Sequence, residues 1–429
     1  MAHIVFAAPR IDRFPLHERL RRELLRREHR VTVLCCERTD GTFWRAQFDG
    51  VETLPNRRPA NVEVAATQWL ERHRPDLLLF HARRSQKTLA LERAGRATGC
   101  DVLWTGDGLL PHTMQGDEQG LDGAASSGAL RPRDLRAVTP DDELLDASLA
   151  HALSGNRPLA LPSADVRVPP PPRRLVDALA YAAAGRLDRV HGALSAWQGA
   201  LPPSESSRET PPTFDLQPPF VAVLLQHPRD HRLRLDSTEA PTPGEWIDAA
   251  LPAAEQLAPN AQVAVVQPPE RRADGRVAAA LRRRGGGRVH VLPHDAAALA
   301  AATAASIVTV NHPAATAGLL AGTPVLHTGR ALYELEGVTH RITTRTLLED
   351  HHRALAKPRP ALRRRFLTWL LRYGHLWCST TAPSFNGMLG LVDRIEQHAP
   401  TSPAPRRGNY RAGPAWPLGA PESASTLTR

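Results

Sequence analysis

The stretch Ser306–Gly329, SIVTVNHPAATAGLLAGTPVLHTG, predicts the type of fold. Its β-branched run Ile307–Val310 is typical of a buried strand, the small residues that follow are typical of a short helix, and Pro324–His327 favours a second strand. Strand, helix and strand in this order form the unit from which parallel sheets are built. Polar Asn311 and His312 follow the first strand directly, where open α/β sheets bind their ligands.

The same alternation extends along the chain in two series. The first contains the predicted strands Ile4–Ala8, Arg30–Cys36, Leu77–Phe80 and Val102–Thr105, and the second begins at Phe220–Gln226 and includes the opening stretch. Proline- and serine-rich segments lie between the two series and predict a break between domains. We therefore expect an α/β fold with two Rossmann-like lobes, a cleft between the domains and C-terminal helices. The expected parts are an N-terminal α/β domain at 1–150, linkers with a connecting helix at 151–217, a C-terminal α/β domain at 218–345, helices at 346–398 and a disordered tail at 399–429.

Composition narrows the class of protein. The chain has 429 residues, a formal net charge of +10 and 42% hydrophobic residues, which is enough for two cores. No apolar run reaches the roughly 18 residues of a membrane span, and the N-terminus resembles a first strand more than a signal peptide. The four cysteines lack metal-ligand spacing, so we expect buried thiols, a reducing cytoplasm and no metal.

Basic residues exceed acidic ones after His351, where Arg363, Arg364 and Arg365 are consecutive. Such a region can bind nucleic acid, bind an anionic membrane surface, or bind neither. No DNA-binding motif or aromatic-interleaved patch accompanies the arginines, so nucleic acid is not expected. The expected localisation is cytoplasmic, with peripheral attachment at the inner membrane as an option.

Three polar clusters follow predicted strands and supply the candidate site residues. TGDG contains Asp107 and Gly108, LLQHPRDHR contains Gln226 and Asp230, and the opening stretch contains Asn311 and His312. Each cluster alone also fits an ordinary turn, a solvated loop or a locally bonded histidine. Corresponding strand ends of two facing sheets border one cleft, so the three together predict a functional site.

The order of these motifs resembles the bacterial capsule polysaccharide biosynthesis and export proteins, the KpsS-like β-Kdo glycosyltransferases. The resemblance covers roughly residues 1–390. It rests on FPLHERLRRELLRREHRVTVL, WTGDGLLPHTMQGDEQGLDGAAS, LLQHPRD and VTVNHPAATAGLLAGTPVLHTGRALYELEGVT in this order. It implies a GT-B-like fold with a nucleotide-sugar site in the C-terminal lobe and acceptor binding by the N-terminal lobe.

The resemblance further implies retaining transfer of Kdo, an acidic eight-carbon sugar, from CMP-Kdo to a lipid or glycolipid acceptor. Asp230 would be the nucleophile and Asp107 a base or sugar ligand. Such an enzyme needs no cofactor besides its CMP-sugar donor, and its partners would include an anionic membrane surface and capsule export machinery. The residues then expected to bind substrate or nucleotide are Gln226, Gly108, Gln267, Asn311 and His312.

The chain departs from this family's pattern at Gly106, Gln267 and Ala317, where the family has Glu, His and Glu. Two alternatives therefore stay open beside the Kdo transferase. One is a non-catalytic component of capsule assembly or polysaccharide transport with the same fold. The other is a GT-B transferase that uses a UDP- or GDP-sugar.

Overall fold

A computed structural model describes most of the chain as two compact units. Among the described residues, the first unit holds the chain up to Asp107 and from Cys378 onward, and the second holds Gly108 to Trp377. Asp230, the predicted connecting helix and the predicted tail beyond Ala399 lie outside the described residues. The described residues are 1–9, 13–36, 38–54, 58–81, 85–111, 113–121, 124–154, 219–226, 233, 236–237, 242–257, 261–268, 281, 283–284, 286–343, 358–378 and 385–399.

The first unit is built on five parallel strands in the order β5-β4-β1-β2-β3. The chain starts in the middle at β1, adds β2 and β3 on one side, and then crosses to β4 and β5 on the other. These strands are β1 His3–Ala7, β2 Arg30–Cys35, β3 Val51–Thr53, β4 Leu77–Phe80 and β5 Asp101–Asp107. Four of them, β1, β2, β4 and β5, match strands predicted from runs of apolar residues.

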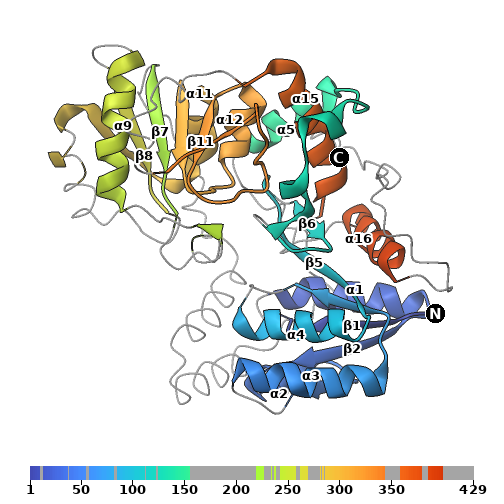
Figure 1. The fold of residues 1–429 in the computed structure, drawn as a ribbon. Helices are drawn as coiled ribbons and strands as arrows, with labels where there is room; N and C mark the ends of the chain where they lie inside the picture. The colour runs from blue at the N-terminus through green and yellow to red at the C-terminus, as the bar shows by residue number, and fades with distance from the viewer. Residues whose placement is uncertain are drawn as a thin grey trace, which may run out of the picture. The chain divides into compact units, whose positions relative to one another are not determined.

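Helices cover the sheet of the first unit (Figure 1). Phe14 of α1 stacks on Phe48 and meets Trp44 of α2, while α3 and α4 pack against each other and are joined by an ion pair between Arg93 and Glu63. The C-terminal helix α16 contacts α1 and β5. The helices are α1 Phe14–Arg26, α2 Arg38–Arg45, α3 Pro59–His73, α4 Gln86–Ala97 and α16 Phe385–His398.

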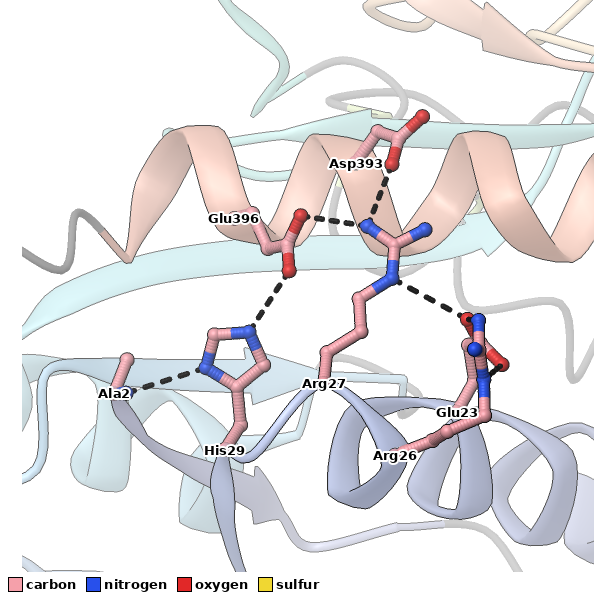
Figure 2. A network of polar contacts seen from close by, with 7 residues as sticks. All are labelled: Ala2, Glu23, Arg26, Arg27, His29, Asp393 and Glu396. Carbon is pink, nitrogen blue, oxygen red and sulfur yellow. Dashed lines mark hydrogen bonds and ion pairs between the residues drawn. The ribbon is translucent and has the colours of Figure 1, made fainter.

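A polar network holds α16 to the first unit (Figure 2). Arg27 donates hydrogen bonds of 2.8 Å to Asp393 and 2.7 Å to Glu396, and His29 contacts Glu396 at 2.9 Å. Burial alone would raise the pKa of Glu396, but the hydrogen bond from His29 and the charge of Arg27 together lower it. Residues from both ends of the described chain therefore complete the first unit.

The second unit contains a six-stranded parallel sheet in the order β12-β11-β10-β7-β8-β9. Alternate residues of β7 face two different apolar clusters, as expected for a strand that is buried on both faces. One cluster includes α11, α12, α5 and α15, and the other includes α9. The strands are β7 Phe220–Leu224, β8 Gln262–Val266, β9 Val289–Leu292, β10 Ser306–Thr309, β11 Val325–His327 and β12 His340–Arg341, and the helices are α5 Asp142–Leu153, α9 Pro243–Leu257, α11 Ala297–Thr303, α12 Ala315–Ala321 and α15 Pro360–Trp369.

Short elements complete the second unit. The π-helical turn η8, Leu370–Gly374, follows α15 and leads into β13, His375–Leu376, which pairs antiparallel with β6, Met114–Asp117. The remaining short elements are the 3-10 turns η3 Ser126–Ala129, η4 Pro132–Leu135, η6 Gly286–Arg288 and η7 His294–Ala296.

The first boundary between the units differs from the expected position at residue 150. Leu144, Leu145 and Ala152 of α5 belong to the same apolar cluster as Phe220 of β7. Asp141 caps α5 by accepting a hydrogen bond of 3.0 Å from the Leu144 amide, and also pairs with Arg372 of η8. These contacts place α5 in the second unit, so the boundary falls between Asp107 and Gly108.

The two parallel α/β units confirm the predicted fold class, while the cleft between them stays a prediction. Within the described part of the chain, no helix has the length and apolar character needed to cross a bilayer.

Candidate functional site

The strand order of the second unit creates a topological switch point between β7 and β10. The chain leaves β7 toward β8 and β9 on one side, then returns to form β10 on the other side of β7. In open parallel sheets, ligands bind beside the carboxyl ends of the two strands at such a point. Gln226 follows β7 there, and Asn311 and His312 follow β10. The structure thus brings together three of the residues predicted from the sequence.

Gln226 and Asn311 form a two-way clamp across this switch point. The Asn311 backbone amide donates to Gln226 Oε1 at 3.1 Å, and Gln226 Nε2 donates to Asn311 Oδ1 at 2.8 Å. Asn311 Nδ2 donates in turn to the Arg330 carbonyl at 3.0 Å, just beyond β11. Because these bonds tie the ends of three strands together, both amides act here as parts of the frame of the site.

His312 is held in the turn that follows the clamp. Its backbone amide donates to Thr309 Oγ1 at 3.2 Å, and its carbonyl accepts from the Tyr333 hydroxyl at 3.2 Å. The Ala314 amide donates to His312 Nδ1 at 3.1 Å. An Nδ1 atom that accepts a hydrogen bond carries no proton, so the neutral ring carries its proton on Nε2 and is a donor there.

His294 adds a second imidazole to this edge. Its ring centroid lies 5.7 Å from that of His312, and it begins η7, which follows β9. Burial lowers the pKa of His294, against the opposing effects of the Asp295 charge and the Gln267 backbone. His294 and Tyr333 were not among the predicted site residues, although His294 also follows a strand and the strand-end criterion would have found it.

Gln267, the remaining candidate in this unit, is buried at the end of β8. The backbone amide of Gln267 donates to the Leu292 carbonyl at 3.0 Å and so extends the pairing of β8 with β9. It lies at the same carboxyl edge as the clamp, two strand positions from β10. A role in binding nucleotide stays a prediction for Gln267. The nucleophile role of Asp230 likewise stays a prediction.

Asp107 ends β5 in the first unit and is ion-paired. Its carboxylate accepts a hydrogen bond of 2.9 Å from Arg13, and about half of its side chain is exposed, against 14% for Arg13. At the same edge, His81 contacts Thr105 Oγ1 at 3.0 Å, and Thr105 donates to the Phe80 carbonyl. Because Asp107 belongs to one unit and His312 to the other, their convergence on one cleft stays a prediction.

Gly108 is required for close packing. A Cβ atom at this position would overlap Thr113 Oγ1 and would lie 3.0 Å from His375 Cδ2. Its amide donates to the Thr113 carbonyl at 2.8 Å. This packing explains why residue 108 is a glycine even if no ligand binds there. Direct substrate binding by Gly108 stays a prediction.

Ala317, one of the departures from the family pattern, is buried in α12. Its side chain is 2% exposed and belongs to the apolar cluster that includes Ile307 and Leu319. Next to it, a Cβ on Gly318 would overlap Ile307 Cδ1 and would lie 2.9 Å from the Ala301 carbonyl. This face of α12 is therefore packed for small side chains, and a glutamate at 317 would bury its charge among them.

The three consecutive arginines of α15 are partly engaged within the second unit. Arg364 pairs with Asp142 of α5. The guanidinium of Arg363 packs against Gly322, where α12 ends in a left-handed conformation, and burial lowers the pKa of Arg363. These contacts give Arg363 and Arg364 a structural role, which was not predicted from the sequence. Binding of a membrane surface by this region stays a prediction.

Metal binding finds no support in the described residues, because no three of their His, Cys, Asp and Glu side chains are grouped as ligands. The four cysteines are buried, and none of them forms a disulfide bond. Burial raises the pKa of the Cys378 thiol to about 12, so this side chain is a neutral thiol at neutral pH.

Comparisons with known proteins give similarity to solved structures alone, since no family model and no curated protein matches the chain. The Thermosulfurimonas dismutans KpsC β-Kdo 2,7 transferase is 13% identical over 92% of this chain and 99% of its own, with a TM-score of 0.43. The β-Kdo 2,4 transferase of the same KpsC is 14% identical over 91% and 98%, with a TM-score of 0.41. MurG of Acinetobacter baumannii is 10% identical over 92% and 100%, with a TM-score of 0.36.

Proposed function

We propose that this chain is a glycosyltransferase whose second unit binds a nucleotide-sugar at the switch point between β7 and β10. The observation that carries the proposal is the clamp between Gln226 and Asn311, which presents His312 at the carboxyl edge of a parallel sheet. A pre-formed site with few polar groups at such an edge is typical of nucleotide-binding units. The first unit, with Asp107 at the end of β5, would bind the acceptor.

The specific donor follows from the sequence motifs. Their order favours an acidic sugar carried by CMP, with Kdo as the first sugar to test, and a lipid or glycolipid acceptor in capsule synthesis. The Asp230 carboxylate would attack the anomeric carbon while the bond to the CMP phosphate breaks and the nucleotide leaves with the electron pair. The acceptor hydroxyl would then displace Asp230 and pass its proton to Asp107, with retention of configuration.

Nucleotide binding is the first test. Thermal unfolding of the full chain is measured with CMP, CMP-Kdo, UDP and GDP. A ligand at 100 times its dissociation constant stabilises the fold by about 2.7 kcal/mol. Stabilisation by CMP and CMP-Kdo alone supports the proposed donor, and stabilisation by UDP or GDP alone replaces it with the other transferase class.

Transfer is the second test, with Asp230→Asn as the variant and Asp146→Asn, an exposed aspartate of α5, as the control. The amide has the shape of the carboxylate but is a far poorer nucleophile, so Asp230→Asn keeps nucleotide binding and loses nearly all transfer. Mass spectrometry of the wild type with donor alone detects one added sugar on Asp230. Near-normal transfer by Asp230→Asn overturns this nucleophile.

A non-catalytic role is the second candidate, because Ala317 is buried where the family has a glutamate. If that glutamate serves catalysis in the family, this chain has replaced it with a packing residue. The scaffold role predicts that the wild type neither binds nucleotides nor transfers sugar, while it still associates with capsule export machinery. Co-purification with that machinery, together with a negative nucleotide screen, supports the scaffold.

A further inference from the structure

We infer that Gln226 is a positioning residue that holds His312 as an Nε2–H donor for a phosphoryl oxygen of the nucleotide. The inference rests on the proposed function, because it assigns the ligand group at that same site. Neither residue is assigned this role by the sequence motifs, which place both of them among direct ligands.

The clamp needs both halves of the Gln226 amide. Its Oε1 accepts from the Asn311 backbone at 3.1 Å while its Nε2 donates to Asn311 Oδ1 at 2.8 Å. A glutamate keeps the acceptor and loses the donor, and a leucine loses both. Since Asn311 also donates to the Arg330 carbonyl at 3.0 Å, Gln226 fixes the peptide that leads into His312 relative to β7 and β11.

The turn then fixes His312 itself. Thr309 Oγ1 donates to the Leu224 carbonyl at 3.1 Å and accepts from the His312 amide at 3.2 Å, so the turn is tied to β7 a second time. Tyr333, which is fully buried, donates to the His312 carbonyl at 3.2 Å. Backbone bonds on both sides of the residue therefore restrict the position from which the ring projects.

The proton on the ring follows from the Ala314 amide, which donates to Nδ1 at 3.1 Å. The lone pair of Nδ1 is engaged, so the neutral ring is a donor at Nε2 without any positive charge. Among the described residues, His294, whose ring centroid lies 5.7 Å away, and Tyr333 are titratable side chains placed against His312. A neutral N–H donor suits a phosphoryl oxygen, and its use does not depend on an imidazolium ion.

The test reads the ring directly. Nitrogen-15 spectra of histidine-labelled full-length protein at pH 7.5, with His312 assigned from a His312→Gln variant, distinguish the two neutral tautomers. We expect the Nε2–H tautomer in the wild type without nucleotide and a tautomer mixture in Gln226→Leu. Gln262→Leu is the matched control, because Gln262 begins β8 at the opposite, amino edge of the same sheet.

Nucleotide affinity provides the second reading. Gln226→Leu is expected to weaken nucleotide binding about tenfold, as for the loss of one well-placed hydrogen bond, while Gln262→Leu leaves it unchanged. If the donor is the neutral ring, wild-type affinity is expected to stay constant between pH 7.5 and 9. Gln226→Glu, which has nearly the same shape, is used if the leucine variant does not fold, and the same loss is expected of it.

Three results overturn the inference. They are an Nδ1–H tautomer in the wild type, an unchanged affinity and tautomer in both Gln226 variants, and a wild-type affinity that falls as pH rises from 7.5 to 9. Absence of all nucleotide binding by the wild type overturns the proposed function and the assigned phosphoryl ligand. The tautomer measurement needs no nucleotide, so it still decides whether Gln226 positions His312.

Discussion

Glu396 of α16 accepts a hydrogen bond of 2.9 Å from Nε2 of His29, a residue 367 positions earlier in the chain (Figure 2). The Ala2 amide donates to His29 Nδ1 at 3.2 Å, so the neutral ring carries its proton on Nε2 and needs an acceptor there. The His29 side chain is only 3% exposed. Glu396 therefore satisfies a buried donor as well as pairing with Arg27.

Replacing Glu396 by alanine is expected to destabilise the first unit. A buried donor left without an acceptor costs about 1–3 kcal/mol, and Arg27 loses one of its carboxylate partners. Urea unfolding of the full chain measures the change. Glu18→Ala, which removes a surface pair with Arg22 one helical turn away, is the control and is expected to cost less than about 0.5 kcal/mol. Equal losses in the two variants would contradict the role given to His29.

The stability of the second unit is expected to fall with acid because of His375. Its Nδ1 donates to the Leu370 carbonyl at 3.1 Å, and its Nε2 accepts from the Leu109 amide at 2.9 Å, so the folded state holds the neutral ring. Burial lowers the pKa of His375 to about 4, from about 6.5 when unfolded. The unfolded chain therefore binds the proton first as pH falls.

The sign of this effect sets the pH window. Above about pH 6.5 the ring is neutral in both states and does not change the free energy of unfolding. Between about pH 6.5 and 4 the free energy of unfolding falls by up to about 3 kcal/mol, because the unfolded state binds the proton more tightly. Urea unfolding at several pH values should show this decline in the wild type. His375→Leu should be less stable at pH 8, because Leu109 loses its acceptor, yet flatter across the window. Parallel curves for the two proteins would exclude His375 as a source of the decline.

A methyl group at Gly318 is expected to disrupt the second unit. The added Cβ would overlap Ile307 Cδ1 between α12 and β10, and would lie 2.9 Å from the Ala301 carbonyl of α11. Overpacking of this kind costs about 1–3 kcal/mol, which thermal unfolding of Gly318→Ala should detect. Gly287→Ala is the control, since no atom lies within 4 Å of a Cβ there. An unchanged thermal stability of Gly318→Ala would mean that α12 can shift on the sheet without cost.

Charge reversal at Arg363 and Arg364 is expected to lower stability in the absence of any membrane. Arg364→Glu faces Asp142, and Arg363→Glu places a carboxylate near the carbonyl groups at the end of α12. Melting temperatures without lipid measure this loss, and Arg136→Glu on the exposed turn after η4 is the control. An unchanged melting temperature of the double variant would contradict the structural role of Arg363 and Arg364. Only in that case could weaker vesicle binding by the double variant be assigned to loss of a membrane contact.

Most strands of the two parallel sheets were predictable because they are nearly continuous apolar runs, whereas the short and polar β3 and β12 were not. Leu77–Phe80 and Phe220–Leu224 are buried on both faces, so local sequence alone carried the signal. The strand β6 was not predicted, since it is short and partly polar, and its pairing depends on His375 and Leu376 far along the chain. The membership of α5 in the second unit also depends on distant packing partners.

The candidate site was predictable in place but not in detail. The rule that ligands bind at strand ends located Gln226, Asn311 and His312. It could not show that the two amides bond to each other, because that contact joins residues 85 positions apart. His294 also follows a strand, but its approach to His312 depends on the path from β9 through α11 and is visible only in the fold.

The docking of α16 on the first unit has a consequence for synthesis of the protein on the ribosome. The helix that contacts α1 and β5 lies at Phe385–His398, after every described residue of the second unit. The residues of α1 and β5 are therefore translated long before the helix that completes their unit. A circularly permuted gene that encodes this helix ahead of Met1 would let the first unit fold during translation. The yield of folded protein from cell-free translation would then be higher than for the original gene.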